Sequence, residues 1–153
     1  MYRRLTAAAV LLLALPVAGP ALLHDSLSAQ QKKLTGYEKG QPYSEAVTVG
    51  NTIYFSGKLG LSSDVRNMPV GSERMKAEVK NILEAYKANF QEMGIGFDDV
   101  VQATVFVKDL KYYNDLNEVW SQYFTDSAPA RAAVGVSDIV AGGMVEIAMT
   151  AVK

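Results

Sequence analysis

Arg131 and Glu146 are the two residues whose type and setting best suit chemistry on a small anion. Arg131 lies in the stretch SAPARAAVGV, where a single arginine stands among small and apolar residues. Arginine is rarely buried without a partner, and its planar fork of donors fits a carboxylate or phosphate in a bidentate manner. Arg131 is therefore either half of an internal ion pair or the binding group for an anion.

Glu146 is the only charged residue in the segment 145–152, VEIAMTAV. In a strand, its side chain shares one face with Ala148 and Thr150. A solvent-facing strand normally carries several polar residues, so a cleft or an interface is expected at this face. If this strand pairs with the strand that begins at Arg131, both charges reach one cavity. The alternatives are a plain ion pair or two unrelated surface charges.

These side chains need a scaffold, and the hydrophobic pattern predicts seven elements. Two β-rich runs flank Gly50 and Asn51, which predicts a hairpin. After a loop over 58–71, apolar residues at helical spacing predict a helix from Ser72 to Met93 that ends at Gly94. The remaining elements are a strand over 100–107, a helix over 111–124, and strands over 131–136 and 144–152.

The element order β-β-α-β-α-β-β predicts an α+β fold. Each amphipathic helix needs an apolar surface, and a sheet offers one, so we expect a mixed sheet with both helices packed on one face. Residues 30–41 are polar and contain glycine, which predicts a linker. Residues 42–153 are enough for one domain with a single core.

The first 29 residues differ in composition from the rest. Arg3 and Arg4 precede a run over 5–23 without a charge. A basic n-region before an apolar h-region is typical of a secretory signal peptide, which predicts an exported, periplasmic or secreted protein with no membrane contact after cleavage. The alternative is an uncleaved membrane anchor, because the run is nearly long enough to span a bilayer.

Charge and residue types exclude several functions of the mature domain. Of the 15 Lys and Arg residues, all but Arg3 and Arg4 lie beyond the apolar run, so 13 remain against 16 Asp and Glu. This acidic balance disfavours a nucleic-acid partner. The sequence has no cysteine, and its one histidine, His24, precedes the domain. Zinc sites of the Cys and His type and histidine-based triads are therefore excluded there, and no metal site is predicted.

Six motifs follow one another through the domain: PYSEAV at 42–47, IYFSGKLGL at 53–61, VVQATVFVKDL at 100–110, LNEVWSQYF at 116–124, PARAAVGV at 129–136 and VEIAMTAV at 145–152. In this order the sequence resembles the Rid, or YjgF-type, reactive-intermediate deaminases. The resemblance implies a chorismate-mutase-like fold and a homotrimer with clefts between subunits. It also implies hydrolysis of 2-imino and 2-enamino acids of the 2-aminoacrylate type to 2-keto acids and ammonia, without a cofactor.

The resemblance implies roles for individual residues. Arg131 matches the family arginine that clamps the substrate carboxylate. Glu146 matches the glutamate that positions the attacking water and shuttles protons. On the residues alone, an ordinary structural role is favoured over a cleft-lining one at two of these positions. Tyr43 suits a strand-end aromatic, and Asn117 suits a solvent-facing position on its helix. The positions that match the substrate-binding cleft are Tyr43, Ser56, Gly57, Lys58, Asn117 and Ala133.

Some positions depart from the family pattern. Lys58 and Gly60 replace the usual Gln and Pro, and Ala148 replaces a second acid often found in the last strand. An extra cation at Lys58, near the cleft, would alter which anion is preferred. A non-catalytic carboxylate-binding or chaperone-like trimer is the alternative to an enzyme. A ribonuclease is disfavoured by the acidic balance and the lack of histidine.

Overall fold

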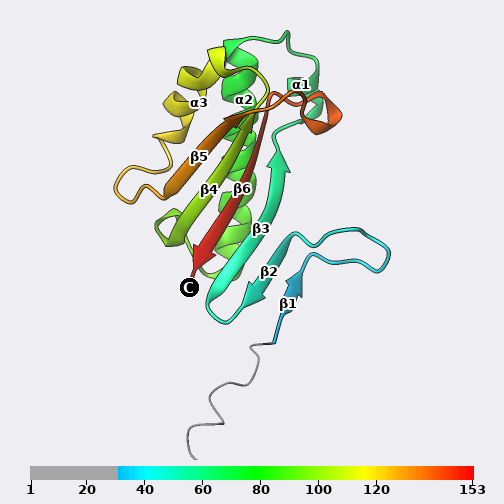
Figure 1. The fold of residues 1–153 in the computed structure, drawn as a ribbon, viewed down its shortest axis with the longest axis vertical. Helices are drawn as coiled ribbons and strands as arrows, with labels where there is room; N and C mark the ends of the chain where they lie inside the picture. The colour runs from blue at the N-terminus through cyan, green and yellow to red at the C-terminus, as the bar shows by residue number, and fades with distance from the viewer. Residues whose placement is uncertain (1–30) are drawn as a thin grey trace, which may run out of the picture. The chain divides into compact units, whose positions relative to one another are not determined.

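The computed structural model describes residues 31–153; the predicted leader over 1–29 lies outside the described residues. Six strands form one mixed sheet in the order β1-β2-β3-β6-β4-β5 (Figure 1). Neighbouring strands are antiparallel except for β4 and β5, which are parallel. The strands are β1 (Lys33–Thr35), β2 (Ala46–Val49), β3 (Thr52–Leu59), β4 (Val100–Val107), β5 (Ala130–Gly135) and β6 (Val145–Val152).

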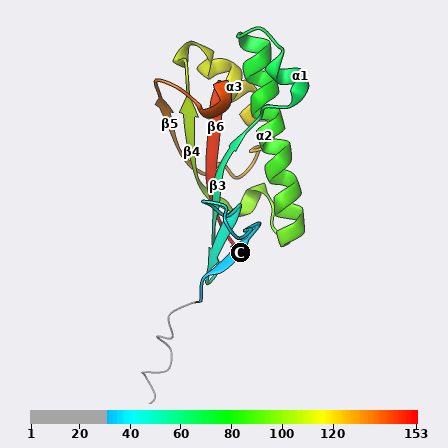
Figure 2. The ribbon, with the colours of Figure 1, turned by 90° about the vertical axis from the view of Figure 1, so that its right-hand side faces the viewer.

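Two helices, α2 (Ser72–Met93) and α3 (Tyr113–Trp120), pack against each other and against one face of the sheet. Seen from the side, this face is covered and the other face is open (Figure 2). The short helix α1 (Ser63–Arg66) precedes α2. The predicted α+β class, with a mixed sheet and helices on one face, is therefore confirmed.

Helix α2 forms because its apolar residues repeat at helical spacing. Gly94 ends it in the left-handed conformation, with φ of 66°, where glycine has no Cβ to clash. Burial of each large apolar side chain contributes about 1.5–3 kcal/mol to folding. The side chains of the predicted stripe that are at most 1 % exposed are Met75, Val79, Ile82, Leu83, Tyr86 and Phe90.

The predicted hairpin and the last three strands lie where the pattern indicates them, but the predicted linker and loop contain additional structure. Lys33–Thr35, within the predicted linker, forms strand β1 against the edge of β2. Three residues are too few for a periodic pattern, and the free edge of β2 supplies the hydrogen-bonding partners. Within the predicted loop over 58–71, β3 continues to Leu59 and Ser62 caps α1 by accepting a hydrogen bond from the Val65 amide.

The second predicted helix, over 111–124, is shorter than expected. Asp109 accepts a hydrogen bond from the Lys111 amide, which starts a 3-10 turn over Leu110–Tyr112, and α3 then ends at Trp120. Side-chain hydrogen bonds of this kind compete with regular helix, so a periodic pattern overestimates the helical length.

A buried ion pair connects α2 to the segment that enters β6. Arg74 and Glu78 are 8 % and 0 % exposed, and the Arg74 Nε lies 2.8 Å from the Glu78 Oε1. The other carboxylate oxygen accepts from the Met144 amide at 2.7 Å, and the Arg74 Nη2 donates to the Gly142 carbonyl at 2.9 Å. The pair is therefore satisfied by backbone as well as by charge, which offsets the cost of burying it.

We expect Glu78→Leu to lower the free energy of unfolding by about 3–5 kcal/mol, because it leaves the Arg74 guanidinium buried without its partner. Urea denaturation at one fixed protein concentration measures this change. The control is Lys87→Met on the same helix, which removes an exposed pair with Glu84 and should cost less than about 1 kcal/mol. Equal losses in the two variants would contradict the prediction.

In the part of the chain that the structure describes, every helix is too short or too polar to cross a membrane.

Candidate active site

A β-bulge in β3 shapes the backbone beside Glu146. Phe55 pairs with Met149 and Lys58 with Ile147, so two residues, Ser56 and Gly57, face the single residue Ala148. One extra residue reverses the faces to which the following side chains point. Leu59 therefore shares the open face of the sheet with its register partner Glu146.

Glu146 lines a pocket of about 300 Å³ on this open face. Its carboxylate lies directly against Gly57, where a Cβ would overlap Oε1, so a larger residue at this position would displace the carboxylate. Tyr43 stands at the same pocket with 63 % of its surface exposed. Within residues 31–153 Glu146 takes part in none of the ion pairs. We call Tyr43, Ser56, Gly57 and Glu146 the glutamate half-site.

Ser56 ties the bulge to the segment that carries Tyr43. Its hydroxyl donates to the Ser44 carbonyl at 2.6 Å, and its amide donates to the Glu45 carbonyl at 3.0 Å. These two bonds connect consecutive backbone groups of the 43–45 segment to β3. The glutamate half-site is thus assembled from β3, β6 and this segment within one chain.

Arg131 lies against α3, on the face of the sheet that the helices cover. Its Nη2 donates to the Tyr113 hydroxyl at 2.9 Å and to the Asn117 Oδ1 at 2.6 Å. Its guanidinium carbon lies 4.8 Å from the centroid of the Trp120 ring, which is a cation–π distance. The neutral partners leave the charge of Arg131 unbalanced, and Nη1 is buried without an acceptor. We call Tyr113, Asn117, Trp120 and Arg131 the arginine half-site.

The two half-sites lie on opposite faces of the sheet. β4 runs between β5 and β6, so the strands that carry Arg131 and Glu146 do not pair. Arg131 is in register with the buried Ala103, whereas Glu146 is in register with Phe106, three residues further along the same strand. The expectation that strand pairing brings both charges to one cavity is therefore wrong for a single chain. An ion pair between Arg131 and Glu146 within one chain is excluded for the same reason.

Lys58 and Ala133, both predicted to bind substrate, lie on the covered face. Ala133 packs against the core. The Lys58 Nζ lies 5.4 Å from the centroid of the Tyr86 ring in α2. Simple alternation from Phe55 would place Lys58 beside Glu146, but the bulge reverses its direction. The expected extra cation is therefore absent from the glutamate half-site of the described chain.

Sequence reasoning does not identify Tyr113 and Trp120 as site residues, because aromatic residues on an amphipathic helix more often pack in the core than contact a ligand. Trp120 is indeed 7 % exposed, yet its ring also faces the guanidinium. The available signal was the spacing: Tyr113, Asn117 and Trp120 follow one another at i, i+4 and i+7, on one face of a helix. That face meets the start of β5.

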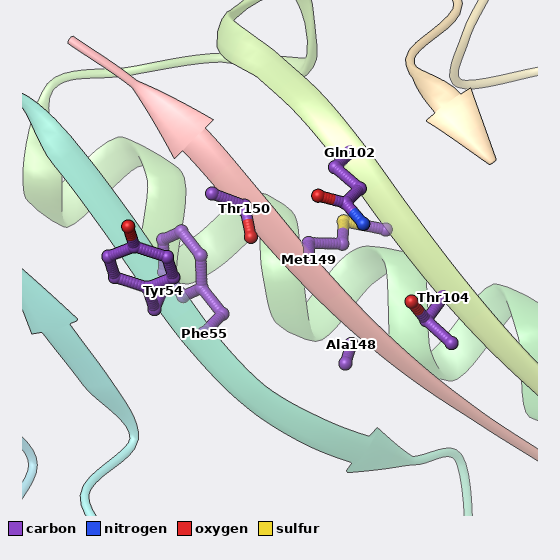
Figure 3. A pocket seen from close by; sticks show the side chains of 7 residues that line it. All are labelled: Tyr54, Phe55, Gln102, Thr104, Ala148, Met149 and Thr150. Carbon is purple, nitrogen blue, oxygen red and sulfur yellow. The ribbon is translucent and has the colours of Figure 1, made fainter. Parts of the chain in front are cut away.

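The open face of the sheet next to the glutamate half-site carries uncharged side chains. Figure 3 shows them projecting from β3, β4 and β6. These side chains line a second pocket on the open face, and the polar or small ones among them are Tyr54, Gln102, Thr104, Ala148 and Thr150.

Among residues 31–153, no group of three or more metal-ligating side chains is close enough to hold an ion.

Comparison with known proteins agrees with the motifs. A family model described as Endoribonuclease L-PSP matches residues 37–153. A protein of Bos taurus named 2-iminobutanoate/2-iminopropanoate deaminase is 42 % identical over 114 residues, which cover 73 % of this chain and 80 % of the bovine protein. A RutC family protein of Sulfurisphaera tokodaii is 37 % identical over 112 residues, covering 73 % of this chain and 88 % of that protein.

Solved structures give the same result. The crystal structure of RidA from the Antarctic bacterium Psychrobacter sp. superposes with a TM-score of 0.65 at 35 % identity, covering 82 % of this chain and 98 % of that one. A YjgF family member of Neisseria meningitidis superposes with a TM-score of 0.67 at 26 % identity, covering 82 % and 97 %. The chain therefore belongs to the Endoribonuclease L-PSP family, the family of the RutC, YjgF and Rid proteins.

Proposed function

We propose that this protein hydrolyses 2-imino and 2-enamino acids to 2-keto acids and ammonia, without a cofactor. The observation that carries the proposal is the pair of uncompensated charges. Arg131 is held by neutral side chains with Nη1 free of an acceptor, and Glu146 borders an open pocket. Such a reaction requires an arginine that is available to bind the substrate carboxylate and a glutamate that is available to bind the attacking water. The bovine relative carries the name of an imine deaminase.

We further propose that each complete site forms between two copies of the chain, in a homotrimer. One chain keeps its half-sites on opposite faces, so a single chain offers substrate only one charge at a time. The open face also carries large apolar side chains that a partner would cover, including Tyr54, Val134 and Val152, each at least 41 % exposed. Exposed apolar surface of this kind is typical of subunit contacts.

The proposed reaction needs one bound anion and one water. Arg131 of one subunit holds the substrate carboxylate, and Glu146 of another subunit accepts a proton from the attacking water. The water oxygen bonds to the carbon of the protonated imine, whose C=N double bond becomes a single bond. Glu146 then returns the proton to nitrogen and takes up the hydroxyl proton as the C–N bond breaks, so ammonia leaves and the keto group forms. Glu146 passes this last proton to the departing ammonia or to solvent, which restores its carboxylate. Orientation and proton transfer together supply the acceleration.

The direct test couples the protein to a serine or threonine dehydratase that releases the imine. Keto-acid formation is followed while semicarbazide competes for the intermediate. The proposal predicts faster release of keto acid with the wild-type protein than with the dehydratase alone. An unchanged rate, with the protein folded and assembled, would overturn it.

Export remains a separate proposal about the first 29 residues. Arg3, Arg4 and the uncharged run over 5–23 support it. Cell fractionation with mass spectrometry of the intact protein tests it: we expect a shortened chain outside the cytoplasm, and a full-length cytoplasmic chain would contradict it.

A further inference from the structure

Tyr86 is a fully buried tyrosine whose hydroxyl the proposed mechanism does not use. It projects from α2 with 0 % exposure and packs against Phe55 and Phe90, with ring centroids 5.8 and 5.7 Å away. A phenylalanine would satisfy that packing equally well. The hydroxyl is therefore a feature that packing alone does not explain.

The hydroxyl reaches the two strands where the bulge separates them. It donates to the Ser56 carbonyl of β3 at 2.9 Å and to the Ile147 carbonyl of β6 at 2.8 Å, sharing one proton between them. The ladder between β3 and β6 is interrupted at this place, since the register shifts between Phe55 and Lys58. Tyr86 thus bridges the interruption from the covered face.

Both carbonyls lie close to Glu146 along the two strands. Ser56 precedes Gly57, whose backbone touches the Glu146 carboxylate, and Ile147 follows Glu146 in the chain. Burial raises the pKa of Tyr86, and the negative charge of Glu146 raises this pKa further. The hydroxyl therefore keeps its proton and stays a donor throughout the physiological pH range.

We propose that Tyr86 is a positioning residue: through the backbones of Ser56 and Ile147 it fixes the bulge against Glu146 and so aims the carboxylate at its water. The inference rests on the proposed deaminase function and adds a residue outside the binding pocket. The Lys58 Nζ, also on the covered face, lies 5.4 Å from the centroid of the Tyr86 ring. The arginine half-site, on α3 and β5, makes no hydrogen bond to Tyr86.

Tyr86→Phe in the full chain is the test, because it keeps the ring and removes only the hydroxyl. We expect kcat for imine hydrolysis to fall about tenfold or more, since small misplacements at a site cost this much. KM should stay within about twofold, because the carboxylate clamp is untouched. Tyr123→Phe is the matched control: this hydroxyl donates to Glu84 at 2.6 Å on the surface, and its loss should leave kcat unchanged.

Amide hydrogen exchange on the same samples separates positioning from general loss of stability. In Tyr86→Phe, exchange should accelerate at Gly57 and Lys58 and stay unchanged at Ile82 in the middle of α2. If the wild type is active and Tyr86→Phe is equally active, the inference about Tyr86 is overturned while the proposed function stands. The same holds if amide exchange in Tyr86→Phe accelerates over the whole core. A wild type without turnover would instead mean that the proposed function has failed.

Discussion

Arg131→Ala is expected to lower kcat/KM for a 2-imino acid by at least about 100-fold. Each hydrogen bond to a charged group contributes roughly 1.5–3 kcal/mol, and the bidentate fork makes two of them. The loss should appear as weaker binding of a 2-keto acid as well as slower turnover, because the carboxylate is common to substrate and product. Kinetics with the coupled dehydratase and calorimetric titration with 2-oxobutanoate measure the two effects.

Arg131→Lys is the control for charge without geometry. Lysine keeps the positive charge but loses the fork that bonds Asn117 and the flat surface that faces Trp120. We expect an activity well below that of the wild type. Full activity in Arg131→Lys would mean that a point charge suffices and that the arginine half-site plays no geometric part.

Glu146→Gln is expected to lower kcat by about 100-fold to 10,000-fold, the range that general acid–base groups contribute. Affinity for 2-oxobutanoate should change little, because in the proposed site the carboxylate binds at Arg131. Glutamine has the size of glutamate, and the contact with Gly57 is preserved, so folding should be unaffected. The measurement combines single-substrate kinetics with titration of the same keto acid.

The same variant separates an enzyme from a binding module. If the protein only binds a small carboxylate, neither the wild type nor Glu146→Gln shows turnover. Loss of turnover with binding retained supports the deaminase, and retained turnover would remove Glu146 from the mechanism.

Much of the scaffold could be predicted from periodicity. The predicted strand over 100–107 is β4, and the predicted helix over 72–93 is α2, with its left-handed Gly94 cap. Each of these two elements buries apolar residues that repeat with the period of its own secondary structure. Because the burial of apolar surface is the main driving force of folding, such a repeat predicts the element well. β1 was not predicted, because a three-residue edge strand depends on its partner strand more than on its own residues.

The arrangement of the candidate site could not be predicted from spacing. Consecutive strands β5 and β6 are separated by β4, and this order depends on the packing of the whole sheet. The bulge at Ser56 and Gly57 then turns Lys58 away from Glu146. Gly57 inside a strand was the one local sign of it, since glycine in a strand often marks a bulge.

Mixing Arg131→Ala with Glu146→Gln tests most directly the claim that complete sites form between chains. The two variants are coexpressed in equal amounts, and the mixed assemblies are assayed for imine hydrolysis. Each site draws its arginine half and its glutamate half from different chains at random, so about a quarter of the sites should be intact. Recovery of about a quarter of wild-type activity, from two variants inactive alone, is the predicted result. No recovery, with mixed assemblies present, would contradict a site shared between chains.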